Sequence, residues 1–539
     1  MEQKLYIRAY TREAVPGIYP DGLARSVHFA YSCDGIRFEP LNQNYGILFA
    51  KGCIRENNTI CPKGLEHPGI LKTEEGAYLI AAKRTEEDGS AEKEPHVLCW
   101  ETKDFLEFMQ IDFPEELSLE DFKDTAEAEP EWYPEWMRRW GRIKNVKMEV
   151  PEEVTVSSLE ELQNIKAEAV YSDGSRIQKR VEWETENLDF SKEQTVRVSG
   201  KVHQQKYPFP LARGFADPVL LRWEGKWYYI STNDNTDNVG IYVREADTIP
   251  ELFAKDVEMH LILDFDEEKD FVQTFWAPEF HQIGGELYIL LAIGGKVWAP
   301  QCHMMKLKKG GKIIDPNSWE TPVRVCRKDG SPLAPNGISL DMTYLNVKSG
   351  SWLIWSYREH IGTALDTGSM LYIARADEAQ PWRLAGEPVL LSRPLYGWEN
   401  VEGTINNEGP YAFVKDGMIY LTYSGGAANG YSYALGLLTA SEDADLSDLA
   451  NWEKSTTAVM SYYSVDGEYG PGHNSFFRDE EGNLMIAYHG VEAIDANIRC
   501  TGIRRVHFDR MGRPTFNMSE ERDVNPDLRN VFMQVNISK

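Results

Sequence analysis

The sequence predicts an all-β protein, with most of the chain built from one repeated four-stranded unit. Three observations lead to this prediction. A unit of strand, glycine turn and aromatic-rich strand recurs from about residue 207 onward, and short alternating strands fill residues 141–206. In addition, 12% of the 539 residues are aromatic, including 26 Tyr and 15 Trp, and β-sheets favour such residues.

The repeated unit has a nearly constant period. Its turn glycines stand at positions 225, 285, 350, 417 and 482, which gives spacings of 60, 65, 67 and 65 residues. Five units of this length are typical of a five-bladed β-propeller with one four-stranded sheet per blade and long loops. We therefore expect residues 207–539 to form five blades around one axis.

The N-terminal residues 1–140 are predicted to form a β-rich, blade-like accessory region. Residues 69–80 give a sixth, weaker match to the repeated unit, outside the regular series. Just before them, Glu66-His67-Pro68-Gly69 has His where the repeat would place an Asp before Pro. We therefore expect this region to be non-catalytic, to pack against the propeller and to shape the rim of its pocket.

Residues 141–206 are predicted to form a small β-sandwich, because several short strands there are separated by turn signals at regular spacing. The run Tyr171-Ser172-Asp173-Gly174-Ser175, followed by Val181-Glu182-Trp183, resembles bacterial immunoglobulin-like modules. The resemblance implies a module with a core around Trp183. We expect it to act as a spacer or packing module rather than as a sugar binder.

Charge and composition exclude several classes of partner. The formal net charge is 57 − 85 = −28, which argues against nucleic acid or an anionic membrane surface. No run of 18 apolar residues and no apolar leader occurs, and the seven cysteines form no CxxC pair. These features predict a cytoplasmic protein with free thiols and no membrane span. The oligomeric state cannot be read from the sequence.

Three carboxylates stand at the starts of predicted blades. Asp217 precedes the first blade, Asp341 the third, and Glu408 opens the fourth. Each alone could be an ordinary turn or cap residue. Because the innermost strands of a propeller begin around one axis, we expect the three to converge, and their repulsion should raise at least one pKa. Glycoside hydrolysis needs such an arrangement, with a protonated acid and an ionised base.

Residues 207–539 resemble glycoside hydrolase family 43, the five-bladed propeller arabinosidases and xylosidases. The resemblance is carried by five motifs whose order matches through all five blades: Ala216-Asp217-Pro218, Phe275-Trp276-Ala277-Pro278-Glu279, Glu408-Gly409-Pro410-Tyr411, Gly470-Pro471-Gly472-His473-Asn474-Ser475 and Tyr488-His489.

The resemblance implies a role for each carboxylate. Asp217 would be the general base that activates water, and Glu408 the general acid on the glycosidic oxygen. Asp341 would keep Glu408 protonated and oriented. The family inverts the anomeric configuration, which requires roughly 6.5–9.5 Å between base and acid to leave room for water.

Four further residues are candidates for the site. Trp276 is expected to form a wall of the sugar pocket, with a buried core Trp as the alternative, and Phe275 is its weaker neighbour. Arg499 resembles an arginine that contacts the substrate in this family, with a surface Arg as the alternative. His473 resembles a histidine that meets a central metal ion, commonly calcium, directly or through water. Calcium prefers oxygen ligands, so a structural calcium near His473 is only one possibility, and the chemistry is expected to require no cofactor.

The sequence thus predicts an inverting exo-glycoside hydrolase. Its product would be a pentose, with α-L-arabinofuranose as the first choice, released from plant cell-wall-derived oligosaccharides. A β-xylosidase is the alternative, followed by an exo-galactanase or an arabinanase. A non-catalytic carbohydrate-binding propeller is the alternative from another class, and the three carboxylates together disfavour it.

Overall fold

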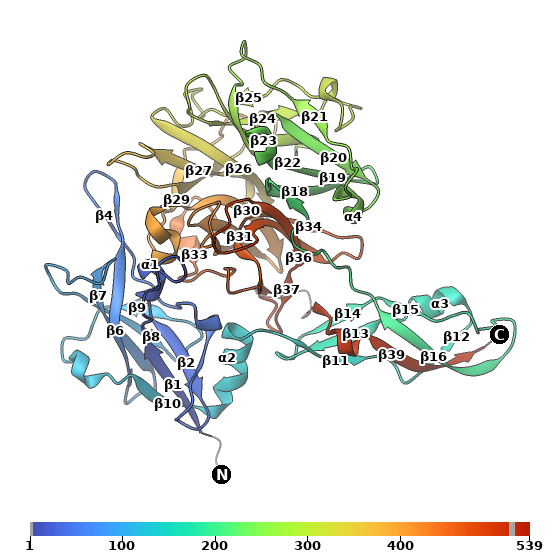
Figure 1. Ribbon diagram of the computed structural model, residues 1–539, viewed down its shortest axis with the longest axis horizontal. Helices are drawn as coiled ribbons and strands as arrows, with labels where there is room; N and C mark the ends of the chain where they lie inside the picture. The colour runs from blue at the N-terminus through green and yellow to red at the C-terminus, as the bar shows by residue number, and fades with distance from the viewer. Residues whose placement is uncertain (1–3, 517–522, 539) are drawn as a thin grey trace.

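The computed structural model describes residues 4–516 and 523–538. Strands joined by turns and loops make up most of the chain, and the helices are few and short. The all-β prediction is therefore confirmed. Figure 1 shows a large body of sheets at the top, the N-terminal region at the lower left and a smaller module at the lower right. Within the described residues, no helix is long and apolar enough to cross a membrane.

The large body contains five four-stranded antiparallel sheets. The first four are β18 (Phe215–Trp223), β19 (Lys226–Asn233), β20 (Ile241–Ala246) and β21 (His260–Leu263); β22 (Gln273–Ile283), β23 (Glu286–Gly294), β24 (Gln301–Lys306) and β25 (Val323–Arg324); β26 (Gly337–Val347), β27 (Gly350–Glu359), β28 (Met370–Arg375) and β29 (Val389–Ser392); β30 (Glu408–Lys415), β31 (Met418–Gly425), β32 (Ala434–Ser441) and β33 (Glu453–Lys454).

The fifth sheet joins the two ends of this body. It consists of β34 (Tyr469–Arg478), β35 (Leu484–Val491), β36 (Cys500–Arg505) and the early strand β17 (Ala212–Arg213), which pairs with β36. The first strands contact one another in the cyclic order β18, β22, β26, β30, β34 and back to β18. The five sheets therefore surround one axis.

The first strand of every sheet has an irregularity at the same place. The residue there has a left-handed backbone: Asp217 (φ 54°), Ala277 (φ 43°), Asp341 (φ 53°), Gly409 (φ 55°) and His473 (φ 44°). The pairing register shifts around each of these positions. A bulge re-aims the side chains beside it, and positive φ is uncommon for residues other than glycine and strained when it occurs. These bulges, four of them at residues other than glycine, thus lie in one ring where the first strands of the five sheets begin.

The N-terminal region contains two further four-stranded sheets and a hairpin. They are β10 (Thr125–Ala128), β1 (Leu5–Tyr10), β2 (His28–Ser32) and β3 (Glu39–Pro40); β6 (Lys63–Lys72), β7 (Tyr78–Glu86), β8 (Val97–Thr102) and β9 (Met109–Ile111); and the hairpin β4 (Cys53–Ile54) and β5 (Ile60–Cys61). Strand β6 has the same bulge as the first strands of the five sheets, with His67 at φ 52°.

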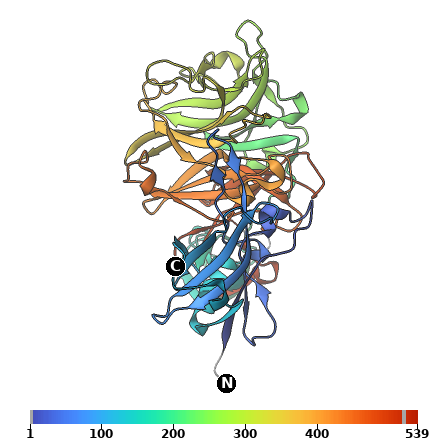
Figure 2. The ribbon, with the colours of Figure 1, turned by 90° about the vertical axis from the view of Figure 1, so that its left-hand side faces the viewer.

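Side-chain contacts fix the N-terminal region to the five sheets, below which it stands in Figure 2. The α2 helix (Tyr133–Trp140) supplies Arg138, whose buried guanidinium lies 2.5 Å from the Asp509 carboxylate. Asn58 lies at the tip of the hairpin formed by β4 and β5. Arg393 donates to the Asn58 side chain at 2.7 Å and to the Thr367 carbonyl at 2.9 Å. Arg393, which directly follows β29, therefore links the N-terminal hairpin to the loop that follows β27.

The small module also contains two sheets, and one of its strands comes from the C-terminus. The sheets are β11 (Asn145–Glu149), β13 (Ala167–Tyr171) and β14 (Arg176–Lys179); and β12 (Glu153–Val156), β39 (Asn530–Ile537), β16 (Gln194–Val202) and β15 (Val181–Trp183), with the short α3 helix (Leu159–Gln163). Trp183 packs in the core of this module, together with Val531 and Val535 of β39.

The sequence analysis predicted that residues 530–537 belong to the same domain as the five blades, and this prediction is wrong. Strand β39 pairs with β12 in parallel and with β16 in antiparallel. Its alternation of buried and exposed residues marks it as a strand with one covered face. Alternation identifies a strand but not its partner, and here the partners lie more than 300 residues earlier in the chain.

Candidate active site

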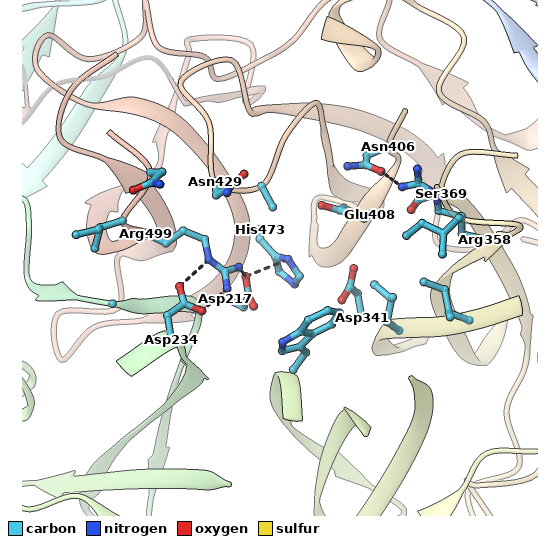
Figure 3. Close-up of a pocket in the computed structure, with 18 of the residues that line it drawn as sticks. Asp217, Asp234, Asp341, Arg358, Ser369, Asn406, Glu408, Asn429, His473 and Arg499 are labelled. Atoms are coloured by element: carbon cyan, nitrogen blue, oxygen red, sulfur yellow. Dashed lines mark hydrogen bonds and ion pairs between the residues drawn. The ribbon is translucent and has the colours of Figure 1, made fainter. Parts of the chain in front are cut away.

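A pocket of about 690 Å³ opens at the end of the five sheets where their first strands begin. Asp217, Asp341 and Glu408 all line it, as do Trp276, Arg499 and His473; the whole lining is Gly214, Asp217, Asp234, Asn235, Trp276, Trp298, Ile338, Leu340, Asp341, Arg358, Ile361, Ser369, Asn406, Glu408, Ala428, Asn429, His473, Asn497, Ile498 and Arg499. Figure 3 shows the three carboxylates around the same space. The convergence predicted from the blade starts is present.

Phe275 does not line the pocket, and its prediction as a substrate contact is wrong. Its side chain is fully buried in the hydrophobic core between the first two sheets. Successive side chains of a strand point to opposite sides, so Trp276 reaches the pocket and its neighbour Phe275 does not. The buried-core alternative considered for Trp276 therefore applies to Phe275.

The Asp217 carboxylate is surrounded by donors. Thr232 Oγ1 donates to its Oδ2 at 2.5 Å, and the Oδ1 atom lies 3.2 Å from His473 Nδ1, 3.1 Å from His489 Nδ1 and 3.5 Å from Arg499 Nη1. Burial alone would raise the pKa of Asp217, but the neighbouring histidines and arginine outweigh it and hold the pKa well below its usual range. Asp217 is therefore ionised at any working pH.

Arg499 is fixed beside Asp217 by a second carboxylate. Its Nε and Nη2 atoms donate to Asp234 at 2.9 and 2.6 Å, a two-point contact that orients the planar guanidinium. Its side chain is only 15% exposed, so the surface-arginine alternative does not hold. Figure 3 shows Arg499 between Asp234 and Asp217.

Glu408, which is partly buried, and the buried Asp341 form a pair of interacting carboxyl groups. Burial raises the pKa of Glu408 to about 7, although the Tyr433 hydroxyl, which donates to Oε1 at 2.9 Å, lowers it. Burial and the charge of Glu408 together raise the pKa of Asp341 well above its usual range. Asp341 Oδ2 accepts the backbone N–H of Gly409 at 3.1 Å, which ties the two carboxylates together. The pair therefore retains a proton at neutral pH.

The backbone before Glu408 is anchored by Asn407, which is fully buried. Its amide nitrogen donates to Glu399 Oε1 at 2.9 Å, and its amide oxygen accepts from Ser392 Oγ at 2.7 Å and from Lys454 Nζ at 3.2 Å. A buried polar side chain with its partners supplied rigidifies its surroundings. Asn407 therefore fixes the position of the carboxylate that follows it.

Sequence reasoning missed several residues that line or support this pocket. Arg358 donates to Asn406 at 2.9 Å beside Glu408, and Tyr433 donates to Glu408 itself. Trp298 contacts Trp276, with ring centroids 6.4 Å apart. No repeated motif marks these positions. Only the paired asparagines directly before Glu408 could have drawn attention to the site's supporting residues.

The surroundings of His473 do not fit a directly bound calcium ion. Burial lowers the pKa of His473 to about 4, so the ring is neutral at ordinary pH. Its Nε2 atom is buried and has no hydrogen-bond partner among the described residues. Calcium prefers oxygen ligands, and in the part of the chain that the structure describes no three His, Cys, Asp or Glu side chains are placed to hold a metal. The free nitrogen suits a water molecule instead.

Comparison with known proteins places the pocket in a family context. The family described as Glycosyl hydrolases family 43 matches residues 207–514. The chain is 32% identical over 329 residues to an "Extracellular exo-alpha-(1->5)-L-arabinofuranosidase" of Streptomyces avermitilis, covering 59% of this chain and 64% of that protein. A protein of the same name from Streptomyces chartreusis is 32% identical over 285 residues, covering 52% of this chain and 82% of its own length.

A solved structure shares the fold of the same part of the chain. It is an α-L-arabinofuranosidase from Lactobacillus brevis, 27% identical, with a TM-score of 0.51, and the match covers 58% of this chain and 97% of that one. The chain spans less than two thirds of the Streptomyces avermitilis relative.

The two Streptomyces relatives are named as extracellular enzymes. This finding contradicts the cytoplasmic location predicted from the sequence. The prediction rested on the absence of an apolar leader and on unpaired cysteines, and all seven cysteines are indeed free. Neither feature determines where a folded enzyme of this kind acts.

Proposed function

The chain belongs to family 43 of the glycosyl hydrolases, and we propose that it is an inverting, exo-acting α-L-arabinofuranosidase. The observation that carries this proposal is that one pocket holds two carboxyl groups in opposite protonation states. Asp217 is held ionised by its donors, whereas burial raises the pKa of Glu408 to about 7. Carboxylates whose environments separate their pKa values in this way are suited to act as base and acid.

In the proposed reaction, Asp217 accepts a proton from a water molecule, whose oxygen attacks the anomeric carbon of the bound sugar. Glu408 donates its proton to the glycosidic oxygen as the bond from that oxygen to the anomeric carbon breaks. The products are a sugar of inverted configuration and a free alcohol on the leaving group. The water must fit between the carboxyl groups, which we expect to lie roughly 6.5–9.5 Å apart. This chemistry needs an acid, a base and water, and no cofactor.

We assign Asp341 the role of keeping Glu408 protonated and in place. Its carboxylate accepts the N–H of Gly409, the residue directly after the acid. Two carboxyl groups that interact this closely share protons, and the last proton leaves the pair at a higher pH than it would leave either group alone.

The same family context supports a finer division of the fold. We propose that the five sheets are the blades of a five-bladed β-propeller, which their cyclic order supports. We propose that residues 141–206, joined by β39, form a bacterial immunoglobulin-like β-sandwich, and that residues 1–140 form an accessory region.

The names of the two Streptomyces relatives favour α-1,5-linked arabino-oligosaccharides as the substrate of this chain. The test is to compare kcat/KM for matched p-nitrophenyl glycosides. We expect the α-L-arabinofuranoside to exceed the β-D-xyloside by a factor of about 10 to 100, because a misplaced hydroxyl leaves a buried polar group unpaired at a cost of about 1–3 kcal/mol. A higher kcat/KM for the xyloside or the galactoside would mean that the enzyme releases that sugar and not arabinose.

Asp341→Asn is expected to move the alkaline limb of the pH profile of kcat/KM to lower pH. Activity requires protonated Glu408 and is lost as pH rises through the pKa of that group. Without the second carboxylate, Glu408 loses its proton at lower pH. Asparagine tolerates the left-handed backbone of position 341, so the fold should persist. The measurement is the pH profile with an arabino-oligosaccharide.

Tyr433→Phe is the matched variant, and it is expected to move the alkaline limb of the pH profile in the opposite direction. The Tyr433 hydroxyl lowers the pKa of Glu408 by donating to its charged form. Its removal should therefore move the alkaline limb to higher pH. If both variants moved the limb in the same direction, Glu408 would not be the group that this limb reports.

A further inference from the structure

The hairpin of β4 and β5 is attached to the five-sheet body at both its base and its tip. Figure 1 shows it reaching from the N-terminal region toward β29. At the base, the Gly52 N–H donates to the Leu395 carbonyl at 2.6 Å. At the tip, Asn58 accepts from Arg393. The segment directly after β29 therefore meets the hairpin at two points.

Arg393 is a buried cation that no carboxylate balances. Its side chain is 7% exposed, and no carboxylate among the described residues raises its pKa, which burial lowers. It donates instead to uncharged oxygens: Nη1 to Asn58 Oδ1 at 2.7 Å, and Nη2 to the carbonyls of Asn58 and Thr367 at 2.8 and 2.9 Å. A buried charge without an opposite charge costs free energy. Stability alone therefore does not account for this arginine.

The contact with Thr367 leads to the proposed acid. Thr367 ends the loop between β27 and β28, and Ser369, two residues later, lines the active-site pocket. The Ser369 carbonyl accepts the N–H of Asn407 at 2.9 Å. Asn407 directly precedes Glu408, so a short run of hydrogen bonds joins Arg393 to the backbone of the acid.

The same loop holds a charged neighbour of the acid. Asp366 in this loop accepts from the Arg358 guanidinium at 2.8 and 2.7 Å, and Arg358 also donates to Asn406 at 2.9 Å. Figure 3 shows Arg358 and Asn406 beside Glu408. A shift of this loop would therefore displace both the backbone that carries Glu408 and the cation next to it.

Arg393 reaches Asn407 from a second direction through its own backbone. The Arg393 carbonyl accepts from Lys454 Nζ at 2.9 Å, and the same ammonium donates to the Asn407 side chain at 3.2 Å. The charge of Lys454 is balanced by Glu399, which lies 2.6 Å away. Buried polar networks with their partners supplied are rigid. The side chain and the backbone of Arg393 thus both bear on the residue before Glu408.

We propose that the N-terminal hairpin is part of the catalytic unit, and that Asn58 and Arg393 are positioning residues that hold Glu408 in place from outside the pocket. The inference rests on the proposed function, in which Glu408 is the acid. Neither Asn58 nor Arg393 lines the pocket, so their effect passes through the contacts described above. An acid must lie within hydrogen-bond distance of the oxygen that it protonates, and a small displacement lowers the rate.

The proposal predicts that Asn58→Gly causes a loss that depends on the leaving group. Glycine keeps the left-handed backbone of position 58, which has φ 66°, but removes the side-chain acceptor. We expect kcat for α-1,5-linked arabinotriose to fall about three- to tenfold with KM nearly unchanged, because a hydrogen bond to a charged group is lost and the acid is held less precisely. For p-nitrophenyl arabinofuranoside, whose leaving group needs no proton, kcat should fall less than about twofold.

Two further variants and a control extend the test. Asn58→Asp keeps an acceptor in the same place and tolerates the same backbone, so it should retain wild-type activity on both substrates. Arg393→Met removes every hydrogen bond of the guanidinium and should lower kcat for arabinotriose about 10²-fold, with a smaller loss for the p-nitrophenyl glycoside. Glu56→Gln changes an exposed residue of the same hairpin and should affect neither substrate. The melting temperature of each variant shows whether the fold persists.

The possible outcomes separate this inference from the proposed function. Equal losses with both substrates in an Asn58→Gly enzyme that melts like the wild type, or no loss with either, would overturn the positioning role while the wild type remained an arabinofuranosidase. A loss in Glu56→Gln as large as that in Asn58→Gly would overturn it too, because the contact with Arg393 would not be responsible. A wild-type enzyme that cleaves neither substrate would overturn the proposed function itself, and the inference with it.

Discussion

Replacing Asp217 by asparagine is expected to lower kcat/KM about 10²- to 10⁴-fold, the usual contribution of a general base. An amide cannot accept the proton of the attacking water. Every substrate needs that water, so the loss should be similar for an arabino-oligosaccharide and for an activated p-nitrophenyl arabinofuranoside. The measurement is kcat/KM for both substrates over a range of pH.

Asparagine is the appropriate replacement because residue 217 has a left-handed backbone, with φ 54°. Asparagine adopts this conformation more readily than most residues, so the bulge should survive. The matched control is Asp237→Asn, an exposed aspartate with φ 53° that does not line the pocket, and it should retain full activity. If the Asp217→Asn enzyme kept its rate with either substrate, Asp217 would not be the base.

Glu408→Gln is expected to affect substrates unequally. The variant lacks the proton that a sugar alcohol needs to depart, so hydrolysis of arabino-oligosaccharides should fall about 10²- to 10⁴-fold. A p-nitrophenolate leaves without protonation, so its release should fall much less. The measurement is the ratio of the two kcat/KM values in the variant and in the wild type.

The pH profile supplies an independent readout for Glu408. In the wild type, activity on oligosaccharides should be lost as pH rises through about 7, where Glu408 gives up its proton. In Glu408→Gln, the remaining activity on the activated substrate should lack this limb. Glu402→Gln is the control, because Glu402 is exposed in the segment before Glu408 and does not line the pocket. Equal losses with both substrates would mean that Glu408 is not the acid.

The three carboxylates could be predicted because they occupy matching places in a repeated unit. Asp217 and Asp341 stand at the bulge of their strands, and Glu408 stands one residue before the bulge of its own. A period near 65 residues locates these places without knowledge of any loop. The repeat therefore identified the floor of the pocket.

The loop residues around the pocket could not be predicted in the same way. Trp298, which lines the pocket, and the buried Tyr433, which donates to Glu408, lie in loops between the second and third strands of their sheets. These loops differ in length from sheet to sheet and no position in the repeat marks them, so the place of each side chain depends on how its loop folds. Strand β39 was assigned to the wrong domain for a related reason, because its pattern shows a strand but does not show its partners, β12 and β16, which lie more than 300 residues earlier in the chain.

The most direct test of the account is the configuration of the first sugar released. The wild-type protein is incubated with α-1,5-linked arabinotriose, and the anomeric protons are followed by NMR from the first seconds, before the sugar equilibrates. If Asp217 activates water while Glu408 protonates the leaving oxygen, arabinose should appear first as the β-anomer, one unit at a time. Initial release of the α-anomer would show retention of configuration, and would contradict a mechanism in which water attacks directly.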